Sequence, residues 1–319
     1  MKVLVTGAAG FIGSHLCDKL IADGNTVVGL DNFDPFYSEE VKRKNLAGCF
    51  GNERFSLVEG DIRDGGCLES VFSENKFDIV VHLAAKAGVR GSIEDPLGYQ
   101  DVNINGTMTL LEVVKAAGVK KFVFASSSSV YGNNKKIPFA EIDNVDFPIS
   151  PYAASKKAGE LICHVYHHLY DISVMCLRLF TVYGPRQRPD LAISKFTRLI
   201  LAGKEVPMFG DGSMARDFTY IDDIISGILA AMEACSGYKI FNLGESRPYR
   251  LDNLISELER VLNKKAIIKR LPVPDCEVKQ TYADIVRAQT KLGYQPQTRL
   301  PEGLKNFVSW LTEGAKSSE

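Results

Sequence analysis

Residues 2–13, with the sequence KVLVTGAAGFIG, decide the fold that we expect for this chain. Residues 2–6 form a short apolar run that is typical of a buried strand, and glycines follow it at positions 7, 10 and 13. From 14 to 23 the apolar residues recur with helical spacing. The stretch therefore predicts a strand, a glycine turn and a helix in succession.

A glycine turn between a strand and a helix is a place where a dinucleotide can bind. Backbone amides and the positive end of the helix can receive a pyrophosphate there. A second predicted strand, at 25–30, ends on Asp31, which lies 18 residues after Gly13. A carboxylate at this distance accepts hydrogen bonds from the adenosine ribose hydroxyls and repels a 2′-phosphate. The pattern therefore favours NAD over NADP.

Further apolar runs extend this pattern along the chain. They predict four more strands, at 55–59, 77–83, 121–125 and 173–177. Helical stretches such as 97–117 separate them, and this alternation indicates an α/β fold with a doubly wound parallel sheet. After about Phe180 the chain is rich in Pro- and Gly-containing loops, with one more strand at 239–243 and short helices at 193–201, 222–234, 251–262 and 301–311. We interpret this part as a smaller C-terminal domain interleaved with the sheet.

Composition excludes several classes of protein. With 319 residues, 45% of them hydrophobic, the chain can bury the core of one large or two closely joined domains. The net charge of -1 provides no field for collecting nucleic acid or an anionic membrane, and no apolar run approaches the ~20 residues of a membrane span. The seven cysteines contain no Cys-x-x-Cys pair, which fits free thiols in a reducing compartment. Because the N-terminus also has no signal-peptide pattern, we expect a cytoplasmic protein.

A candidate base lies in the YAASK stretch at 152–156. If 151–169 is a helix, Tyr152 and Lys156 share one face. A tyrosine ionises near pH ~10, so catalysis at neutral pH needs roughly 4 kcal/mol of preferential stabilisation of the phenolate. A second positive charge, such as an oxidised nicotinamide ring, would help. A chain of this composition contains about one Tyr-x-x-x-Lys by chance, and the pair at Tyr131 and Lys135 encloses Gly-Asn-Asn turn chemistry instead.

Several ordered motifs together resemble the extended short-chain dehydrogenase/reductase family of nucleotide-sugar epimerases and dehydratases. They are TGAAGFIG at 6–13, ASSSSVYG at 125–132, YAASK at 152–156, RLFTVYGPRQRPD at 178–190 and FGDGSMARDFTYIDD at 209–223. The resemblance implies that Ser127 is the hydroxyl partner of Tyr152. It also implies that Lys156 binds the nicotinamide ribose and lowers the pKa of Tyr152, and that Asn103 supports the active-site helix.

The resemblance further implies a Rossmann-type NAD-binding domain at 1–178, to which the chain returns near 220–250, and a nucleotide-sugar-binding domain at 179–319. Asp61 and Ile62 are expected near the adenine, and the small residues Ala84 and Ala85 either let the chain pass close to the cofactor or serve packing. The residues that we expect to bind NAD are Gly7, Gly10, Phe11, Ile12, Gly13, Asp31, Asn32, Asp61, Ile62, Ala84, Ala85, Lys86, Tyr152 and Lys156.

The positions after the reactive serine favour one reaction within the family. Dehydratases usually carry an Asp-Glu pair here, and decarboxylases of UDP-glucuronate usually place Glu just before Val-Tyr-Gly. This chain has Ser128 and Ser129. With no extra carboxylate to remove a proton from C5, epimerisation at C4 is the leading interpretation.

The substrate that the resemblance implies is a UDP-sugar. Arg216 is similar to the family arginine that holds the diphosphate, although an ion pair with a neighbouring aspartate is an alternative. Thr181 and the run that follows it, with LDNFDPFY at 30–37, resemble the subgroup acting on UDP-glucuronate. We expect Ser127, Ser128 and Thr181 to surround its carboxylate and Arg188 to brace the loop or the nucleotide. The full set of expected substrate-binding residues is Arg90, Ser127, Ser128, Ser129, Thr181, Arg188, Lys195, Phe196, Met208, Phe209 and Arg216.

Alternatives remain open at this point. Phe196 fits a core position as well as a uracil contact. Lys86 replaces the usual Gln, Cys276-Glu277 replaces the usual Gly-Asp, and Thr281 would not exclude a bulkier C2 substituent. A UDP-glucose or UDP-N-acetylglucosamine 4-epimerase, a UDP-glucuronate decarboxylase and a non-catalytic NAD-binding regulator are therefore further hypotheses.

Two expectations concern metals and partners. The three histidines of the helix at 151–169, which are His164, His167 and His168, are interpreted as packing or interface residues, and no metal site is expected. Relatives often dimerise through helices corresponding to 97–117 and 151–169, so a homodimer is expected, with neither nucleic acid nor membrane as a partner.

Overall fold

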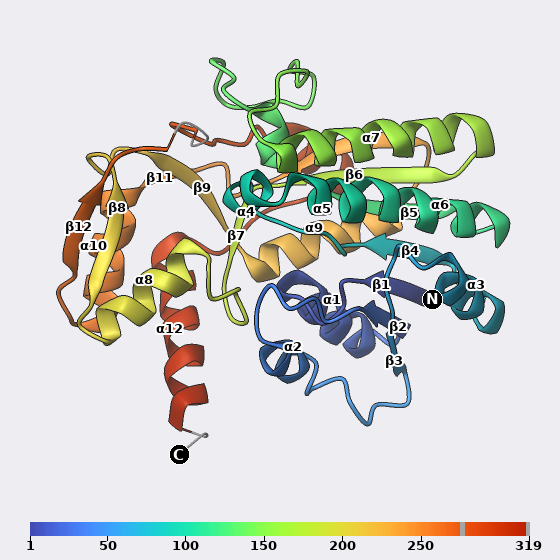
Figure 1. Cartoon of the computed structure of the whole chain (residues 1–319), viewed down its shortest axis with the longest axis horizontal. Coiled ribbons are helices and arrows are strands. Elements are labelled where there is room, and N and C mark those ends of the chain that lie inside the picture. Colours follow the sequence, from blue (N-terminus) through green and yellow to red (C-terminus); the bar gives the residue numbers. More distant parts are fainter. Residues whose placement is uncertain (275–277, 317–319) are drawn as a thin grey trace.

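The computed structural model describes residues 1–274 and 278–316 (Figure 1). The departure from the family pattern at Cys276 and Glu277 lies outside these residues. No described helix combines the length and the apolar character that crossing a membrane requires.

A seven-stranded parallel sheet forms the centre of the molecule, with the strand order β10-β6-β5-β4-β1-β2-β3. Its strands are β1 (Lys2–Thr6), β2 (Thr26–Asp31), β3 (Phe55–Glu59), β4 (Ile79–His82), β5 (Lys121–Ser127), β6 (Ser173–Leu179) and β10 (Tyr238–Leu243). Every strand predicted from the apolar runs is present, because β4 and its neighbours are buried on both faces, which requires nearly continuous apolar sequence. The doubly wound parallel sheet is therefore confirmed.

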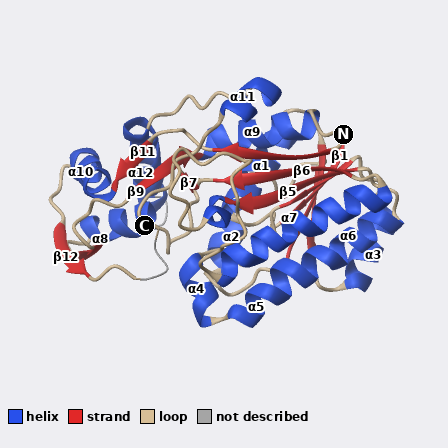
Figure 2. Ribbon diagram, turned by 90° about the horizontal axis from the view of Figure 1, so that it is seen from above, coloured by secondary structure: helices blue, strands red, loops and turns tan. Residues whose placement is uncertain are grey.

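Helices cover both faces of this sheet (Figure 2). On one face, α1 (Phe11–Ala22) and α9 (Ile221–Glu233) bury Leu16 and Ile228 in one apolar cluster. On the other, α3 (Gly65–Glu74), α6 (Thr107–Ala116) and α7 (Pro151–Tyr170) bury residues such as Leu68 and Leu110 in a second cluster. The two clusters hold the sheet between them and leave its carboxyl edge open for a ligand.

The segment expected as one helix at 97–117 is interrupted. It consists of α5 (Pro96–Gln100), the π-helical turn η1 (Asp101–Gly106) and α6. Asn103 lies in this wide turn, and its side chain bonds to the backbone of Lys86 and to Ser155. Turns of this kind often mark functional sites, and here long-range hydrogen bonds stabilise a geometry that helical spacing does not encode.

The C-terminal part lies beside the carboxyl edge of the large sheet, at the left of Figure 1. It contains two small sheets, formed by β7 (Thr181–Tyr183), β9 (Ala215–Tyr220) and β11 (Pro248–Arg250), and by β8 (Glu205–Phe209) and β12 (Ile267–Leu271). Its helices are α8 (Ala192–Leu201), α10 (Leu251–Leu262) and α12 (Leu300–Lys316), whereas α11 (Val286–Leu292) packs against α9 and β10 of the large sheet (Figure 2). The five strands of these sheets escaped prediction because they are short and carry polar or exposed residues.

A buried ion pair ties helix α7 to the sheet. Glu160 and Arg178 form two parallel hydrogen bonds of 2.8 and 2.9 Å, and each side chain is only 1% exposed. The hydroxyl of Ser126 donates a third bond of 2.7 Å to Glu160. Because both charges lack water, these short hydrogen bonds are their main compensation, with the ring of Tyr131 4.8 Å from the Arg178 guanidinium as a weaker one.

Removing one member of this pair should therefore destabilise the protein strongly. We expect Glu160→Ala to lower the free energy of unfolding by about 3–5 kcal/mol, because it leaves the guanidinium buried and uncompensated. As a control, Glu40→Ala breaks an exposed pair with Lys44, which solvent screens, and should leave the free energy of unfolding almost unchanged. Urea unfolding of both variants measures the difference; equal costs would contradict the role of the buried pair.

Candidate active site

A cavity of about 490 Å³ opens at the carboxyl edge of the large sheet. Its lining comes from the ends of the central strands and from the C-terminal part, including Thr181, Arg216 and Thr281. In open parallel sheets this edge is where ligands bind. The predicted glycine turn, Asp31 and the pair Tyr152 and Lys156 all line this one cavity.

The glycine turn at 7–13 brings backbone to the cavity wall. Gly7 has a φ of +71°, and a Cβ there would lie 2.7 Å from the amide nitrogen of Ala84. A Cβ on Gly13 would lie 2.1 Å from the carbonyl oxygen of Gly7. Helix α1 begins at Phe11 with no side-chain cap, so amides of its first turn are available to a ligand. The turn fits a pyrophosphate.

Asp31 is fixed at the opposite side of this turn. Its carboxylate accepts hydrogen bonds of 2.9 Å from the amides of Ala9 and Phe33. Burial raises the pKa of Asp31, while those amides and the charge of Lys42 lower it. Asn32 donates to Asp61 at 2.9 Å, and Ile62 also lines the cavity. This end presents carboxylates suited to ribose hydroxyls.

Lys42 is a lining residue that the sequence analysis missed. It lies on α2 (Glu39–Asn45), is buried, and donates a 2.8 Å hydrogen bond to the carbonyl of Asp34. The nearby LDNFDPFY stretch was the only signal that this region belongs to the site.

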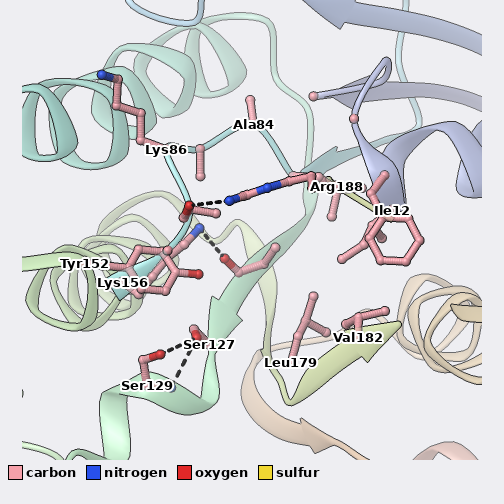
Figure 3. Close-up of a pocket in the computed structure, with 18 of the residues that line it drawn as sticks. Ile12, Ala84, Lys86, Ser127, Ser129, Tyr152, Lys156, Leu179, Val182 and Arg188 are labelled. Carbon is pink, nitrogen blue, oxygen red and sulfur yellow. Dashed lines mark hydrogen bonds between the residues drawn. The ribbon is translucent and has the colours of Figure 1, made fainter. Parts of the chain in front are cut away.

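Tyr152 and Lys156 point from α7 into the cavity (Figure 3). The helix begins at Pro151, and the hydroxyl of its N-cap Ser150 accepts a 3.1 Å bond from the amide of Ala153. Lys156 donates a 2.7 Å hydrogen bond to the carbonyl of Ala125, and burial lowers its pKa to about 8. The ammonium is therefore held against the end of β5.

Burial raises the pKa of Tyr152 above its usual value, and two groups act against this. They are a hydrogen bond with Ser127 and the positive charge of Arg188. Arg188, expected from the sequence to brace the loop or the nucleotide, is therefore a second cation that acts on the phenol. Arg188 extends toward the side of the cavity where Tyr152 lies, and it donates to the carbonyl of Ala87 at 3.0 Å (Figure 3). It also forms an ion pair of 2.7 Å with Asp190.

Hydroxyl groups surround the next part of the cavity. Ser127 donates to Ser129 Oγ at 3.2 Å and accepts from the amide of Ser129 at 3.1 Å. Ser128 and Thr181 also line it. The acidic residues among the described lining are Asp31, Asp34 and Asp61, all near the glycine turn. The described lining at the serine end thus offers hydroxyl donors and the guanidinium of Arg188 but no carboxylate, and the carboxylate that pairs with Arg188, on Asp190, lies outside the lining.

The structure brings some other expected residues to the cavity and leaves others away from it. Arg216 lines it, on β9. Lys86 lines it with its backbone side, while its ammonium turns away and pairs with Asp95 at 2.7 Å. Five expected substrate residues are absent from the described lining. Phe196 and Met208 are buried in the core, and Lys195 is exposed to solvent. The other two contact each other, because the guanidinium of Arg90 lies 4.4 Å from the centre of the Phe209 ring.

Two of the three histidines of α7 pack against an aromatic side chain, and the third, His168, is exposed. His164 and His167 lie 4.9 and 6.3 Å from the ring of Tyr238. Within residues 1–274 and 278–316, no group of His, Cys, Asp or Glu is arranged to hold a metal ion.

Comparisons with known proteins agree with this arrangement. A profile of the NAD dependent epimerase/dehydratase family matches residues 3–244. A UDP-glucuronate 4-epimerase of Thermodesulfobacterium geofontis is 44% identical over 97% of this chain and 96% of its own length. UDP-glucuronate 4-epimerase 2 of Arabidopsis thaliana is 47% identical over 97% of this chain and 75% of its own. The crystal structure of a UDP-glucuronic acid 4-epimerase from Bacillus cereus with UDP-glucuronic acid and NAD has a TM-score of 0.93 and 40% identity, covering 98% of this chain and 99% of that one.

The lowered pKa of Lys156 predicts a pH-dependent stability. Between pH about 8 and 10.5 the folded protein binds fewer protons at Lys156 than the unfolded chain does, so this residue's contribution to stability rises with pH. In NAD-free protein, we expect the stability of wild type relative to Lys156→Met to increase by about 3 kcal/mol across this window. Urea unfolding of both proteins at several pH values checks this, and a difference that stays constant with pH would contradict it.

Proposed function

This chain belongs to the NAD dependent epimerase/dehydratase family, and we propose that it interconverts UDP-glucuronate and UDP-galacturonate by epimerisation at C4 with NAD. The observation that carries the proposal is the single cavity that joins an NAD-type glycine turn to Tyr152, Lys156 and a carboxylate-free set of hydroxyl donors. Its relatives named UDP-glucuronate 4-epimerase, and a UDP-glucuronic acid complex in a similar structure, support this substrate.

The residues present fit NAD. Gly7 and Gly13 leave no room for a Cβ beside the turn, and α1 offers free amides to a pyrophosphate. Asp31 would hold the adenosine ribose and disfavour a 2′-phosphate. We propose that residues 1–178, with the return near 220–250, bind NAD and that residues 179–319 bind the nucleotide sugar. When bound, NAD supplies the oxidising and reducing equivalents exchanged with C4.

The side chains of the site have separable tasks. Tyr152 removes the proton of the C4 hydroxyl as C4 becomes a ketone, and returns it when the ketone is reduced on its other face. The positive charge of Arg188 favours the phenolate. We propose that Lys156, one helical turn from Tyr152, adds to this effect. The hydroxyl of Ser127 acts to lower the pKa of the phenol and, once it turns from Ser129, can contact the reacting oxygen. No net oxidant is consumed.

A glucuronate substrate makes one side reaction possible, because its 4-keto form is a β-keto acid that can lose carbon dioxide. We propose that Ser127, Ser128 and Thr181 hold the carboxylate out of the alignment that this loss requires. The described residues that line this end include no acidic side chain, and the carboxylate of Asp190 is paired with Arg188 outside the lining, so no lining carboxylate repels an anionic sugar.

We further propose a cytoplasmic homodimer. Helix α7 exposes Leu161, Val165 and Leu169 at successive four-residue spacings, with exposures of 56, 48 and 58%, and α6 exposes Met108. This apolar row on adjacent helices is suited to a second copy. The six cysteines among the described residues are all unpaired, which is compatible with a reducing compartment.

Loss of the phenol should abolish turnover. We expect Tyr152→Phe to lower kcat by about 10²–10⁴-fold, because the base is removed, while the Kd of NAD changes little. NMR of the sugar products measures kcat. Titration of the protein with NAD, followed by the intrinsic fluorescence of the protein, measures the Kd. Tyr170→Phe, at the exposed end of the same helix, is the control and should retain full activity. Substantial turnover by Tyr152→Phe would refute the base assignment.

Loss of the Thr181 hydroxyl tests the restraint on the carboxylate. We expect Thr181→Ala to release more carbon dioxide per epimerisation event from UDP-glucuronate, or to cut turnover, because one hydrogen-bond donor is lost. Products are quantified by NMR, with Thr290→Ala on exposed α11 as the control. If neither quantity changes, Thr181 does not hold the carboxylate.

The substrate itself is tested by incubating the protein with UDP-glucuronate, UDP-glucose and UDP-N-acetylglucosamine in parallel. We expect C4 inversion of UDP-glucuronate without loss of carbon dioxide. Inversion of a neutral sugar alone would indicate a neutral-sugar epimerase, and a pentose product would indicate a decarboxylase. No reaction with any of them, and no NADH fluorescence, would indicate a non-catalytic NAD-binding protein.

A further inference from the structure

His82 is a buried polar residue that the mechanism above does not use. It ends strand β4, is 1% exposed, and lies between the rings of Phe122 and Phe124. Each ring nitrogen has one partner: Nδ1 lies 2.7 Å from the hydroxyl of Thr6 and Nε2 lies 3.0 Å from that of Thr107. Because both ring nitrogens are hydrogen-bonded and the surroundings are apolar, the imidazole links strand β1, which carries Thr6, to helix α6, which carries Thr107.

The surrounding bonds assign the tautomer of His82. Thr107 donates its only hydroxyl hydrogen to the carbonyl of Asn103 at 2.7 Å, so it can only accept from His82. The ring proton is therefore on Nε2, and Nδ1 accepts from Thr6. The hydroxyl of Thr6 in turn accepts from the amide of Ala84 at 3.2 Å. The bonds thus run in one direction from Ala84 to Asn103.

Both ends of this chain of bonds reach the cavity wall or the catalytic helix. Ala84 and Lys86 line the cavity, and Asn103 holds the amide and carbonyl of Lys86 at 2.8 and 2.9 Å. Asn103 also donates to Ser155 Oγ at 2.9 Å, and Ser155 donates to the carbonyl of Tyr152 at 2.9 Å. The π-helical turn η1 is what carries Asn103 between them.

The chain of bonds requires a neutral ring. An imidazolium carries a proton on both nitrogens and would leave Thr6 without its acceptor. Burial, helped by the positive charge of Lys156, lowers the pKa of His82 to about 3, so the ring stays neutral at physiological pH.

We propose that His82 is a positioning residue for the epimerisation reaction: its Nε2–H imidazole holds the cavity-lining segment 84–86 in register with the helix that carries Tyr152 and Lys156. It acts through Thr6, Thr107 and Asn103 and touches neither cofactor nor sugar. The kinetic part of this inference, that His82 affects kcat, rests on the proposed function. The assignment of the ring proton to Nε2 does not.

A matched pair of threonine variants tests the kinetic part. Thr107 and Thr197 are both buried and both donate to the carbonyl four residues earlier at 2.7 Å, but Thr197 lies on α8 outside this chain of bonds. We expect Thr107→Val to lower kcat by about 10-fold or more with little change in KM, because displaced catalytic groups lose alignment. Thr197→Val should keep wild-type kcat. Equal kcat values for the two variants, with wild type active, would overturn the proposal.

Variants of His82 separate its two bonds. His82→Asn can keep an acceptor for Thr6, and His82→Gln can keep a donor for Thr107, whereas His82→Phe keeps neither. We expect His82→Phe to have the lowest kcat and at least one of the amide variants to recover part of it. If all three have wild-type kcat, or if neither amide recovers any activity in a folded protein, the assigned role is wrong.

The unaltered NAD-bound protein provides a readout besides activity. We expect ¹⁵N NMR of its histidine rings to show one ring, assigned by its absence in His82→Asn, as the Nε2–H tautomer without titration between pH 6 and 8. An Nδ1–H tautomer or a titrating ring would overturn the proposal even if no UDP-sugar is turned over. Failure of wild type on every UDP-sugar would instead reject the proposed function.

Discussion

The ion pair between Glu160 and Arg178 is the constraint on which the geometry of the active site depends. Glu160 lies on the same face of α7 as Tyr152 and Lys156, at successive four-residue spacings. Because its partner Arg178 is fixed in the central strand β6, the helix cannot roll without breaking two charge-assisted hydrogen bonds in a dry interior. The same carboxylate also holds Ser126, the neighbour of Ser127. One buried pair thus orients the phenol of Tyr152, the ammonium of Lys156 and the backbone next to Ser127 together.

The cavity divides into two ends of different charge. Asp31 and Asp61 lie at the glycine turn, where ribose hydroxyls need acceptors, and Arg188, Arg216 and the serines lie toward the other end. The cations suit a diphosphate and a sugar acid. The described lining at that end holds no carboxylate that an elimination could use as base, and the carboxylate of Asp190, outside the lining, is paired with Arg188. The same partition therefore accounts for the choice of cofactor and for the choice of epimerisation.

Much of the fold and part of the candidate site could be predicted. The central strands were predictable because each is a continuous apolar run, and the glycine turn because its glycines stand between an apolar run and a helical pattern in one short stretch of sequence. The π-helical turn at Asn103 was not, because bonds to Lys86 and Ser155 stabilise it. The uracil-side residues remain predictions: Phe196 and Met208 have the apolar character of a ligand contact, yet an apolar side chain is equally satisfied in the core where the structure has them.

By itself the sequence determined the order of strands and helices, the pyrophosphate turn and the helical spacing of Tyr152 and Lys156, because each depends on residues close together in the chain. Only the tertiary structure decided that Arg188 faces Tyr152, that the ammonium of Lys86 leaves the cavity for Asp95, and that His82 joins Thr6 to Thr107. These contacts connect segments far apart in sequence. Their geometry follows from how the helices and the C-terminal part pack against the sheet. The periodicity of apolar residues along the chain does not encode that packing.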